Sequence, residues 1–360
     1  MIDSVAFERL RRIGLSQTGL QLFWPLLELH PGGVPLRVTE VQRESVALHD
    51  GHTEHDGRLL PALRNDLAAQ GDALAVGDWV LAERNAFGQW WVVARATPSN
   101  QLARRLHDGR DKVARAVIVS NVDTALLVMG LDHDFNTRRL ERYLALVRMA
   151  GVAAVVVLTK KDLCADAAQR LQQVQTMLPP DALAVAVDAL GTEPLVALQP
   201  WLQQGQTLVL LGSSGAGKST LTNALCRQQV ADTGANRSGD SRGRHTTTVR
   251  SLHVTPLGAC IIDTPGLRTL RLDGDAAELD AAFGDIAELA LQCRFRDCRH
   301  EAEPGCAVRA GVAFERLRNY QKLQREARRD TLTALERKVQ VSEWKARTRQ
   351  GRLRAETKRG

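Results

Sequence analysis

The stretch Gly212-Ser-Ser-Gly-Ala-Gly-Lys-Ser219 decides the fold class of this 360-residue chain. It matches the pattern G-x-x-x-x-G-K-[ST] in full, between an apolar run at 207–211 and a segment of helical spacing from residue 219. Glycines there let backbone N–H groups turn inward around phosphates, and the helix N-terminus adds partial positive charge. We predict a phosphate-binding loop made of Gly212, Ser213, Ser214, Gly215, Ala216, Gly217, Lys218, Ser219 and Thr220. The Lys218 ammonium would reach the β- and γ-phosphates, and the Ser219 hydroxyl would bind Mg²⁺.

A second motif, Asp263-Thr-Pro-Gly266, ends the apolar run Ile261-Ile262. A carboxylate at a strand end near a phosphate loop can hold Mg²⁺ through water, and the Gly266 N–H can sense a γ-phosphate. The intervening segment 232–248 is rich in Gly, Arg and Ser and ends in three threonines. We expect nucleotide and Mg²⁺ to organise this segment. One threonine of 246–248, here taken as Thr247, would supply the second hydroxyl to the metal, and its two neighbours are the alternatives.

A third motif, Thr159-Lys-Lys-Asp162, follows the buried run that ends at Leu158. It matches N-K-x-D except that Thr replaces Asn. The Asp162 carboxylate can accept hydrogen bonds from N1–H and the 2-amino group of guanine, whereas adenine offers no donor at either place. The Lys160 stem would cover the base, and the backbone N–H of Ala189 could contact it from the loop after 183–187. The motif therefore predicts a preference for guanine.

The order of these motifs along the chain is unusual. In ordinary small GTPases the phosphate loop comes first and the base-reading loop last, but here residues 159–162 precede 212–219, and 263–266 come last. This order indicates a circular permutation, which a sheet tolerates when the original termini lie close together.

The rest of the chain falls into three regions. Residues 1–100 contain short β-like runs at 35–42, 44–51, 73–84 and 89–96, broken by turn signals, which predict a small barrel. After a basic linker at 101–112, residues 113–290 alternate strand-like and helix-like segments, which predicts a mostly parallel sheet with helices on both faces. Residues 291–360 hold a Cys/His cluster and a basic tail of helical character. The fold class is thus multidomain, with a barrel, an α/β domain and a small helical domain.

The cluster Cys293-x₄-Cys298-x-His300-x₅-Cys306 offers three thiolates and one imidazole. Four N/S ligands with no open position suit one structural, tetrahedral Zn²⁺. The spacing differs from that of paired CxxC knuckles, so unligated surface cysteines are the alternative.

Charge and composition limit the class of protein. The net charge of +7 is concentrated at 316–360, where 15 Lys/Arg outnumber 5 Asp/Glu. A polyanion such as nucleic acid is therefore the expected partner of this tail. A solvated helix face explains the tail, taken alone, equally well. The longest apolar run, Gly151–Leu158, is too short for a bilayer span, and the N-terminus has no apolar signal region. We therefore expect a cytoplasmic monomer with no membrane partner.

With these motifs in place, the sequence resembles the circularly permuted, ribosome small-subunit-dependent GTPases over nearly its whole length. The resemblance rests on VGDWV (76–80), NVDTALLVMG (121–130), GSSGAGKST (212–220), GRHTTT (243–248), IIDTPGLR (261–268) and CRFRDCRHEAEPGCAVRAG (293–311). It implies an N-terminal OB-fold, a permuted GTPase domain and a C-terminal zinc-binding domain. It also implies that the chain binds the small (30S) ribosomal subunit and its rRNA, assists late maturation of that subunit, and hydrolyses GTP to GDP faster when bound to it.

The sequence departs from the family's usual pattern at two places. Thr159 stands where the family usually has Asn, and Asp188-Ala189 where it usually has Ser-Ala. Leu267 occupies the place where ordinary GTPases often have a water-orienting Gln. His245 is therefore our candidate catalytic residue, a role that the resemblance supports and that suits a side chain titrating near neutral pH.

Two other functions remain open from the motifs. One is an ATP-dependent P-loop enzyme, against which Asp162 argues. The other is an RNA-binding protein with a vestigial GTPase fold, against which intact Lys218, Ser219 and Asp263 argue.

Overall fold

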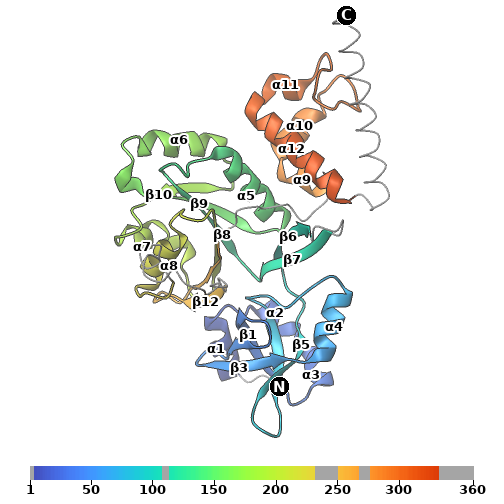
Figure 1. Cartoon of the computed structure of the whole chain (residues 1–360), viewed down its shortest axis with the longest axis vertical. Coiled ribbons are helices and arrows are strands. Elements are labelled where there is room, and N and C mark those ends of the chain that lie inside the picture. Colours follow the sequence, from blue (N-terminus) through green and yellow to red (C-terminus); the bar gives the residue numbers. More distant parts are fainter. Residues whose placement is uncertain (1–3, 108–112, 232–249, 267–275, 332–360) are drawn as a thin grey trace, which may run out of the picture. The chain divides into compact units, whose positions relative to one another are not determined.

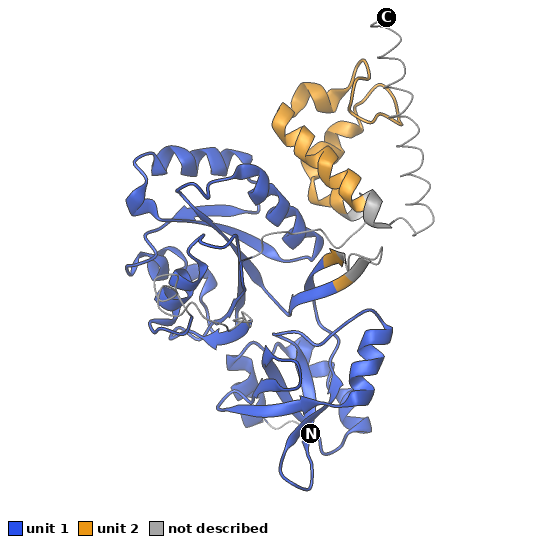
Figure 2. Cartoon of the chain, in the orientation of Figure 1, with its two compact units in different colours: residues 1–104, 116–270 blue, residues 105–115, 271–360 orange. Residues whose placement is uncertain are grey.

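The structure is a computed structural model that describes residues 4–107, 113–231, 250–266 and 276–331. Its residues form two compact units (Figure 2). Unit 1 comprises residues 1–104 and 116–270, and unit 2 comprises residues 105–115 and 271–360. Within the described ranges, no helix combines the length and apolarity needed to cross a bilayer.

The N-terminal part of unit 1 is a closed five-stranded barrel, preceded by three short helices (Figure 1). Its strands follow the order β1-β2-β3-β5-β4 and close through the pairing of β1 with β4. All neighbours are antiparallel except β3 and β5, which run parallel. The elements are α1 (Ser4–Arg12), α2 (Gln17–Gln21), α3 (Trp24–Leu29), β1 (Val34–Val41), β2 (Val46–His49), β3 (Glu54–Leu59), α4 (Pro61–Ala69), β4 (Trp79–Arg84) and β5 (Trp90–Arg95).

The barrel interior is apolar, because alternate residues of its strands face inward. Its core includes Leu36, Leu48, Val80 and Val92, none of which is exposed. Trp79 is buried, whereas Trp90 and Trp91 are half-buried. The sequence therefore correctly indicated a barrel, but β3 was not among the predicted strands because its sequence, EHDGRL, is mostly polar.

The α/β part of unit 1 contains a sheet of order β10-β9-β8-β11-β13-β12. The first five of these strands are parallel and β12 is antiparallel to β13. The strands are β8 (Thr124–Gly130), β9 (Ala153–Thr159), β10 (Leu183–Ala186), β11 (Thr207–Leu211), β12 (Ser251–Val254) and β13 (Cys260–Asp263). This arrangement matches the mostly parallel sheet expected from the alternating pattern.

Helices cover both faces of this sheet. On one face, α8 packs Leu221 and Leu225 against alternate residues of the strands, such as Val128 and Leu210. On the other, α5 contacts β8 and β9. The helical segments are α5 (Thr137–Met149), η1 (Lys161–Leu163), α6 (Ala167–Met177), α7 (Glu193–Ala197), η2 (Gln199–Trp201) and α8 (Lys218–Cys226).

Within unit 1 the barrel and the α/β sheet are joined directly. Strand β1 pairs with β12, with Glu40 opposite Ser251. The Arg37 side chain is fully buried and donates from Nη2 to Thr207 Oγ1 (2.9 Å) and to the Asn121 carbonyl (3.2 Å). Burial lowers the pKa of Arg37, although the nearby Asp123 carboxylate opposes this effect. A buried charge held by several acceptors fixes the barrel to the base of β11.

The segment expected as a linker at 101–112 is partly a strand. Residues Gln101–His107 form β6, which pairs with β7 (Val113–Ser120) in a separate two-stranded sheet. The apolar run of β7, expected in the parallel sheet, therefore lies outside it.

Apart from the pieces of β6 and β7 at 105–107 and 113–115, the described part of unit 2 consists of helices and loops. It contains α9 (Ala276–Ala282), α10 (Gly284–Ala290), α11 (Ala307–Gly311) and α12 (Phe314–Thr331). The Tyr320 ring packs against Phe283, and its hydroxyl donates to Asp280 Oδ1 at 2.6 Å. The loop 291–306 between α10 and α11 carries the Cys/His cluster.

Candidate nucleotide site and metal cluster

The three predicted nucleotide loops leave the same edge of the sheet. Parallel strands direct their carboxyl ends to one edge, where ligands of α/β proteins usually bind. The loop at 159–162 follows β9, the loop at 212–217 follows β11, and Asp263 ends β13. Because β11 lies between β8 and β13, and β9 is next to β8, these segments converge despite their separation in the sequence.

The phosphate loop is a tight turn between β11 and α8. Lys218 is only 6% exposed, and its Nζ donates to the carbonyl oxygens of Gly212 (3.2 Å) and Ser213 (2.8 Å). Gly217 has φ +92°, a left-handed conformation that side chains disfavour, and it caps α8. The loop therefore holds the lysine ammonium against its own carbonyl oxygens, beside the N-terminus of α8.

Asp263 lies against this loop. Its Oδ2 accepts from Ser219 Oγ at 3.3 Å, whereas its buried Oδ1 has no hydrogen-bond partner within the described residues. Burial raises the pKa of Asp263, and the charge of Lys218 only partly offsets that rise. A buried, unpartnered carboxylate oxygen next to a hydroxyl is a donor set that suits Mg²⁺.

Gly266 approaches the phosphate loop closely. A Cβ at this position would lie 2.5 Å from the backbone nitrogen of Ser214. Any side chain there would displace the loop, so the D-T-P-G turn requires glycine at its last position. The Thr264 hydroxyl fastens the same turn to the Leu210 carbonyl (2.5 Å).

Thr159 connects the base-reading loop to the phosphate loop. It is fully buried, and its hydroxyl donates to the Ala216 carbonyl oxygen at 2.6 Å. The residue that departs from N-K-x-D thus contacts the phosphate loop directly.

The remaining predicted base-reading residues lie on the loop after β9 and on the loop after β10, which contact each other. Lys160 adopts the left-handed conformation (φ +60°), and its Nζ donates to the Gly215 carbonyl at 2.7 Å. Asp162 is exposed in η1. Ala189 is buried in the loop after β10, which approaches the base-reading loop where the Lys161 N–H donates to the Val187 carbonyl (3.4 Å).

Three further carboxylates contact these loops, and no motif predicted them. Asp134 is 8% exposed and accepts from Ser213 Oγ (2.5 Å) and Arg139 Nη2 (2.5 Å). Asp132 and Glu193 accept from Lys160 and Lys161 respectively. The available signal was a pair of acidic residues directly after the buried run that ends at Gly130, which places them at the same sheet edge.

Two predicted residues cannot be placed. His245 and Thr247, together with the rest of 232–249, lie outside the described residues, as does Leu267. The neighbourhood of Asp263 given above is therefore that formed by the described residues.

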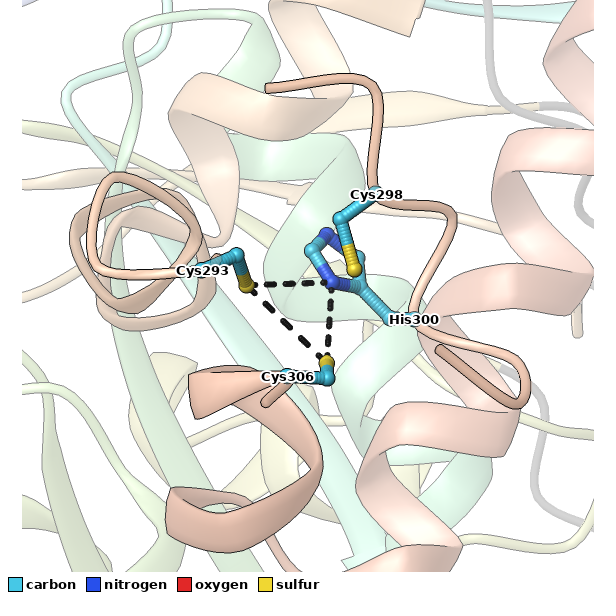
Figure 3. Close-up of side chains that lie close together, drawn as sticks. All are labelled: Cys293, Cys298, His300 and Cys306. Atoms are coloured by element: carbon cyan, nitrogen blue, oxygen red, sulfur yellow. Dashed lines mark hydrogen bonds between the residues drawn. The ribbon is translucent and has the colours of Figure 1, made fainter. Parts of the chain in front are cut away.

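The Cys/His cluster of unit 2 is assembled as the spacing predicted. The ligand atoms of Cys293, Cys298, His300 and Cys306 all lie within 4.8 Å of one another (Figure 3). Cys293 Sγ is 3.9 Å from Cys306 Sγ and 3.7 Å from His300 Nδ1, which is 3.4 Å from Cys306 Sγ. Zn–S and Zn–N bonds of tetrahedral zinc place ligand atoms about 3.5–3.8 Å apart, so the cluster is compatible with one such ion.

The sequence is similar to those of known proteins. A family model described as RsgA GTPase matches residues 97–273. The small ribosomal subunit biogenesis GTPase RsgA of Xylella fastidiosa (strain M23) is 47% identical over 298 residues, which cover 81% of this chain and 87% of that protein. The protein of the same name from Xanthomonas campestris pv. campestris (strain B100) is 43% identical over 303 residues, 82% of each chain.

This chain belongs to the RsgA GTPase family. It is a GTP hydrolase, which removes the ATP-dependent alternative considered from the motifs, and the resemblance stated from the sequence is confirmed.

Solved structures give the same fold. The crystal structure of YjeQ from Thermotoga maritima matches with a TM-score of 0.60 at 23% identity, covering 82% of this chain and 98% of that one. The crystal structure of YloQ, a circularly permuted GTPase, matches with a TM-score of 0.57 at 22% identity, covering 84% and 97%. The circular permutation predicted from motif order is therefore confirmed at the level of the fold.

Proposed function

We propose that this RsgA-family GTPase binds the small ribosomal subunit, assists its late maturation and hydrolyses GTP to GDP and phosphate with subunit-stimulated turnover. One observation carries the assignment of the nucleotide site: the Thr159–Ala216 and Ser219–Asp263 hydrogen bonds join the three motif loops in one place. The partner is proposed from the names of the relatives. Such a protein would work in the cytoplasm, where small subunits mature, and we expect it to act as a monomer.

In this proposal each loop binds a different part of GTP. Asp162 selects guanine through N1–H and the 2-amino group, Lys160 covers the base, and Ala189 contacts it from the loop after β10. The backbone of 212–217, with Lys218, Ser219 and Thr220, holds the phosphates. Gly266 reports the γ-phosphate, because its backbone lies against Ser214.

Mg²⁺ would be held with GTP by Ser219, Asp263 and Thr247. When bound, the metal supplies positive charge that offsets the charge of the β- and γ-phosphates. The unpartnered Oδ1 of Asp263 supports this assignment. His245 would orient the attacking water, because the Leu267 side chain cannot hydrogen-bond to it.

The remaining parts are proposed to bind RNA. The barrel strands follow the order of an OB-fold, a fold that binds single-stranded nucleic acid on its strand faces and loops. We propose domains at 1–100, 113–290 and 291–360. The last would carry one structural Zn²⁺ on Cys293, Cys298, His300 and Cys306, with the basic tail contacting rRNA.

Phosphate release from GTP and from ATP, measured with and without purified small subunits, tests the proposal. We expect turnover of GTP that rises at least tenfold when small subunits are added, and no comparable turnover of ATP. Lys218→Ala, checked for folding by circular dichroism, should lose nucleotide binding and should release no phosphate from GTP, with or without small subunits. A chain that binds small subunits but turns over no GTP in their presence would point to a vestigial site and contradict the proposal.

A further inference from the structure

Asp132 lies on the loop 131–136, between β8 and α5, and contacts the base-reading lysine. Its Oδ2 accepts from Lys160 Nζ at 2.7 Å, and the same ammonium donates to the Gly215 carbonyl at 2.7 Å. Lys160 Nζ is therefore held by two acceptors, one from the loop after β8 and one from the phosphate loop.

The other oxygen of Asp132 has a separate task. Its Oδ1 accepts from the Asp134 N–H at 3.0 Å, within the same loop. Burial by itself would raise the pKa of Asp132, but the hydrogen bond and charge of Lys160 lower it below its ordinary value. Asp132 is thus ionised beside the ammonium. Its Oδ1 holds the loop, whereas its Oδ2 faces Lys160 and, at 3.3 Å, Nδ1 of the exposed His133.

This arrangement restricts the Lys160 side chain through contacts within the protein itself. A free lysine side chain loses conformational entropy when its stem becomes ordered against a ligand. The backbone of Lys160 is set by its left-handed conformation, and its ammonium by two acceptors. The stem between them has few conformations left, so it presents its methylene groups at a defined place.

We propose that Asp132 is a positioning residue for guanine-nucleotide binding, holding the Lys160 stem where it covers the base. This rests on the proposed nucleotide site. Because Asp132 acts on the base side, its contribution is the same for GDP and GTP. Asp132 therefore raises the affinity for guanine nucleotides and leaves the turnover number at saturating GTP unchanged.

Nucleotide affinities of a double-mutant cycle test the proposal, with fluorescent GDP and a non-hydrolysable GTP analogue as probes. Asp132→Asn keeps an amide oxygen for the Asp134 N–H but removes the charged acceptor for Lys160. We expect the affinity for both nucleotides to fall about fivefold, because a partly exposed, charge-assisted ion pair contributes about this much. The kcat should remain unchanged. In a Lys160→Met background the same substitution should change affinity less than twofold.

A matched control is Asp166→Asn, which makes the same change of charge on an exposed side chain that forms no cap hydrogen bond at the start of α6. It should leave both affinities unchanged. If Asp132→Asn lowers nucleotide affinity equally in the parent chain and in the Lys160→Met background, Asp132 supports the fold and not Lys160, and the proposal is overturned. An unchanged affinity of Asp132→Asn in the parent chain would also overturn it. If Lys160→Met and Lys218→Ala both bind nucleotide normally, the proposed site itself is wrong.

Discussion

The hydroxyl of Thr159 donates a 2.6 Å hydrogen bond to the carbonyl oxygen of Ala216, 57 residues further along the chain. Both residues are fully buried. This bond joins the end of β9 to the loop 212–217, so the two loops are connected by the protein's own hydrogen bonding. The side chain at the position of the usual Asn is therefore an integral part of the site.

Thr159→Val should weaken both the fold and the site. Valine has nearly the same shape but leaves the buried Ala216 carbonyl without its donor, at a cost of about 1–3 kcal/mol of unfolding free energy. We expect GDP affinity to fall as well, because the phosphate loop loses its support. Urea unfolding and GDP titration measure the two effects. Thr159→Ser keeps the hydroxyl, and if it lost as much GDP affinity as Thr159→Val, the hydrogen bond would not be the cause.

Glu193 connects the base-reading loop to the loop that precedes α7. Its Oε1 accepts from Lys161 Nζ (2.6 Å) and its Oε2 from the Asp188 N–H (2.9 Å). We expect Glu193→Gln to weaken GDP binding about twofold to threefold, since exposed ion pairs contribute little. Stopped-flow dissociation of fluorescent GDP measures this as a faster off-rate. An unchanged off-rate would show that Glu193 does not support the base pocket.

Asp78 should make stability depend on pH. It is fully buried in the barrel, and burial raises its pKa to about 6, with Arg95 at 3.6 Å only partly opposing this. Between about pH 4 and pH 6 the folded chain holds a proton that the unfolded chain has released, so stability falls as pH rises through that window. Above pH 6 the buried, ionised Asp78 carboxylate lowers the free energy of unfolding by about 3 kcal/mol.

The substitution Asp78→Asn removes this titration. The variant should gain stability relative to the parent chain as the pH increases from 4.5 to 7.5, as measured by urea unfolding across that range. Parallel pH profiles for the two chains would contradict the role of Asp78.

The Cys/His cluster should hold one zinc ion per chain. Without it, the loop 291–306 has few apolar side chains to pack, so removing the metal should unfold this part of unit 2. Cys298→Ser should reduce bound zinc well below one equivalent, as measured by elemental analysis, and lower the helix signal. Cys164→Ser, outside the cluster, is the control. Absence of stoichiometric zinc in the parent protein would overturn the assignment.

His245→Ala should separate binding from hydrolysis. We expect GTP affinity to remain within about twofold, while subunit-stimulated phosphate release falls by about 10²-fold, the lower range for loss of a general base or water-positioning group. The comparison is made at saturating GTP and saturating small subunits. Stimulated turnover equal to that of the parent chain would remove His245 from the mechanism.

Much of the fold was predictable from local patterns. The buried runs at 124–130, 153–159 and 207–211 are strands because their apolar residues are continuous and the turns around them contain glycine or polar residues. Strand β3 escaped prediction because Glu54–Leu59 is mostly polar and is held by backbone pairing with β2 and β5. The pairing of β6 with β7, likewise, follows from a partner strand that periodicity cannot reveal.

For the site, the sequence by itself determined the chemical types and their order: a phosphate loop, a carboxylate for Mg²⁺, a base-reading loop and four thiolate or imidazole donors. These follow from short motifs whose function depends on neighbouring residues. The contacts of Asp132, Asp134 and Glu193 with those motifs, and the hydrogen bond from Thr159 to Ala216, became evident in the folded chain alone. These contacts join segments that follow different strands. The order β10-β9-β8-β11-β13, which brings those segments together, depends on packing across the whole sheet.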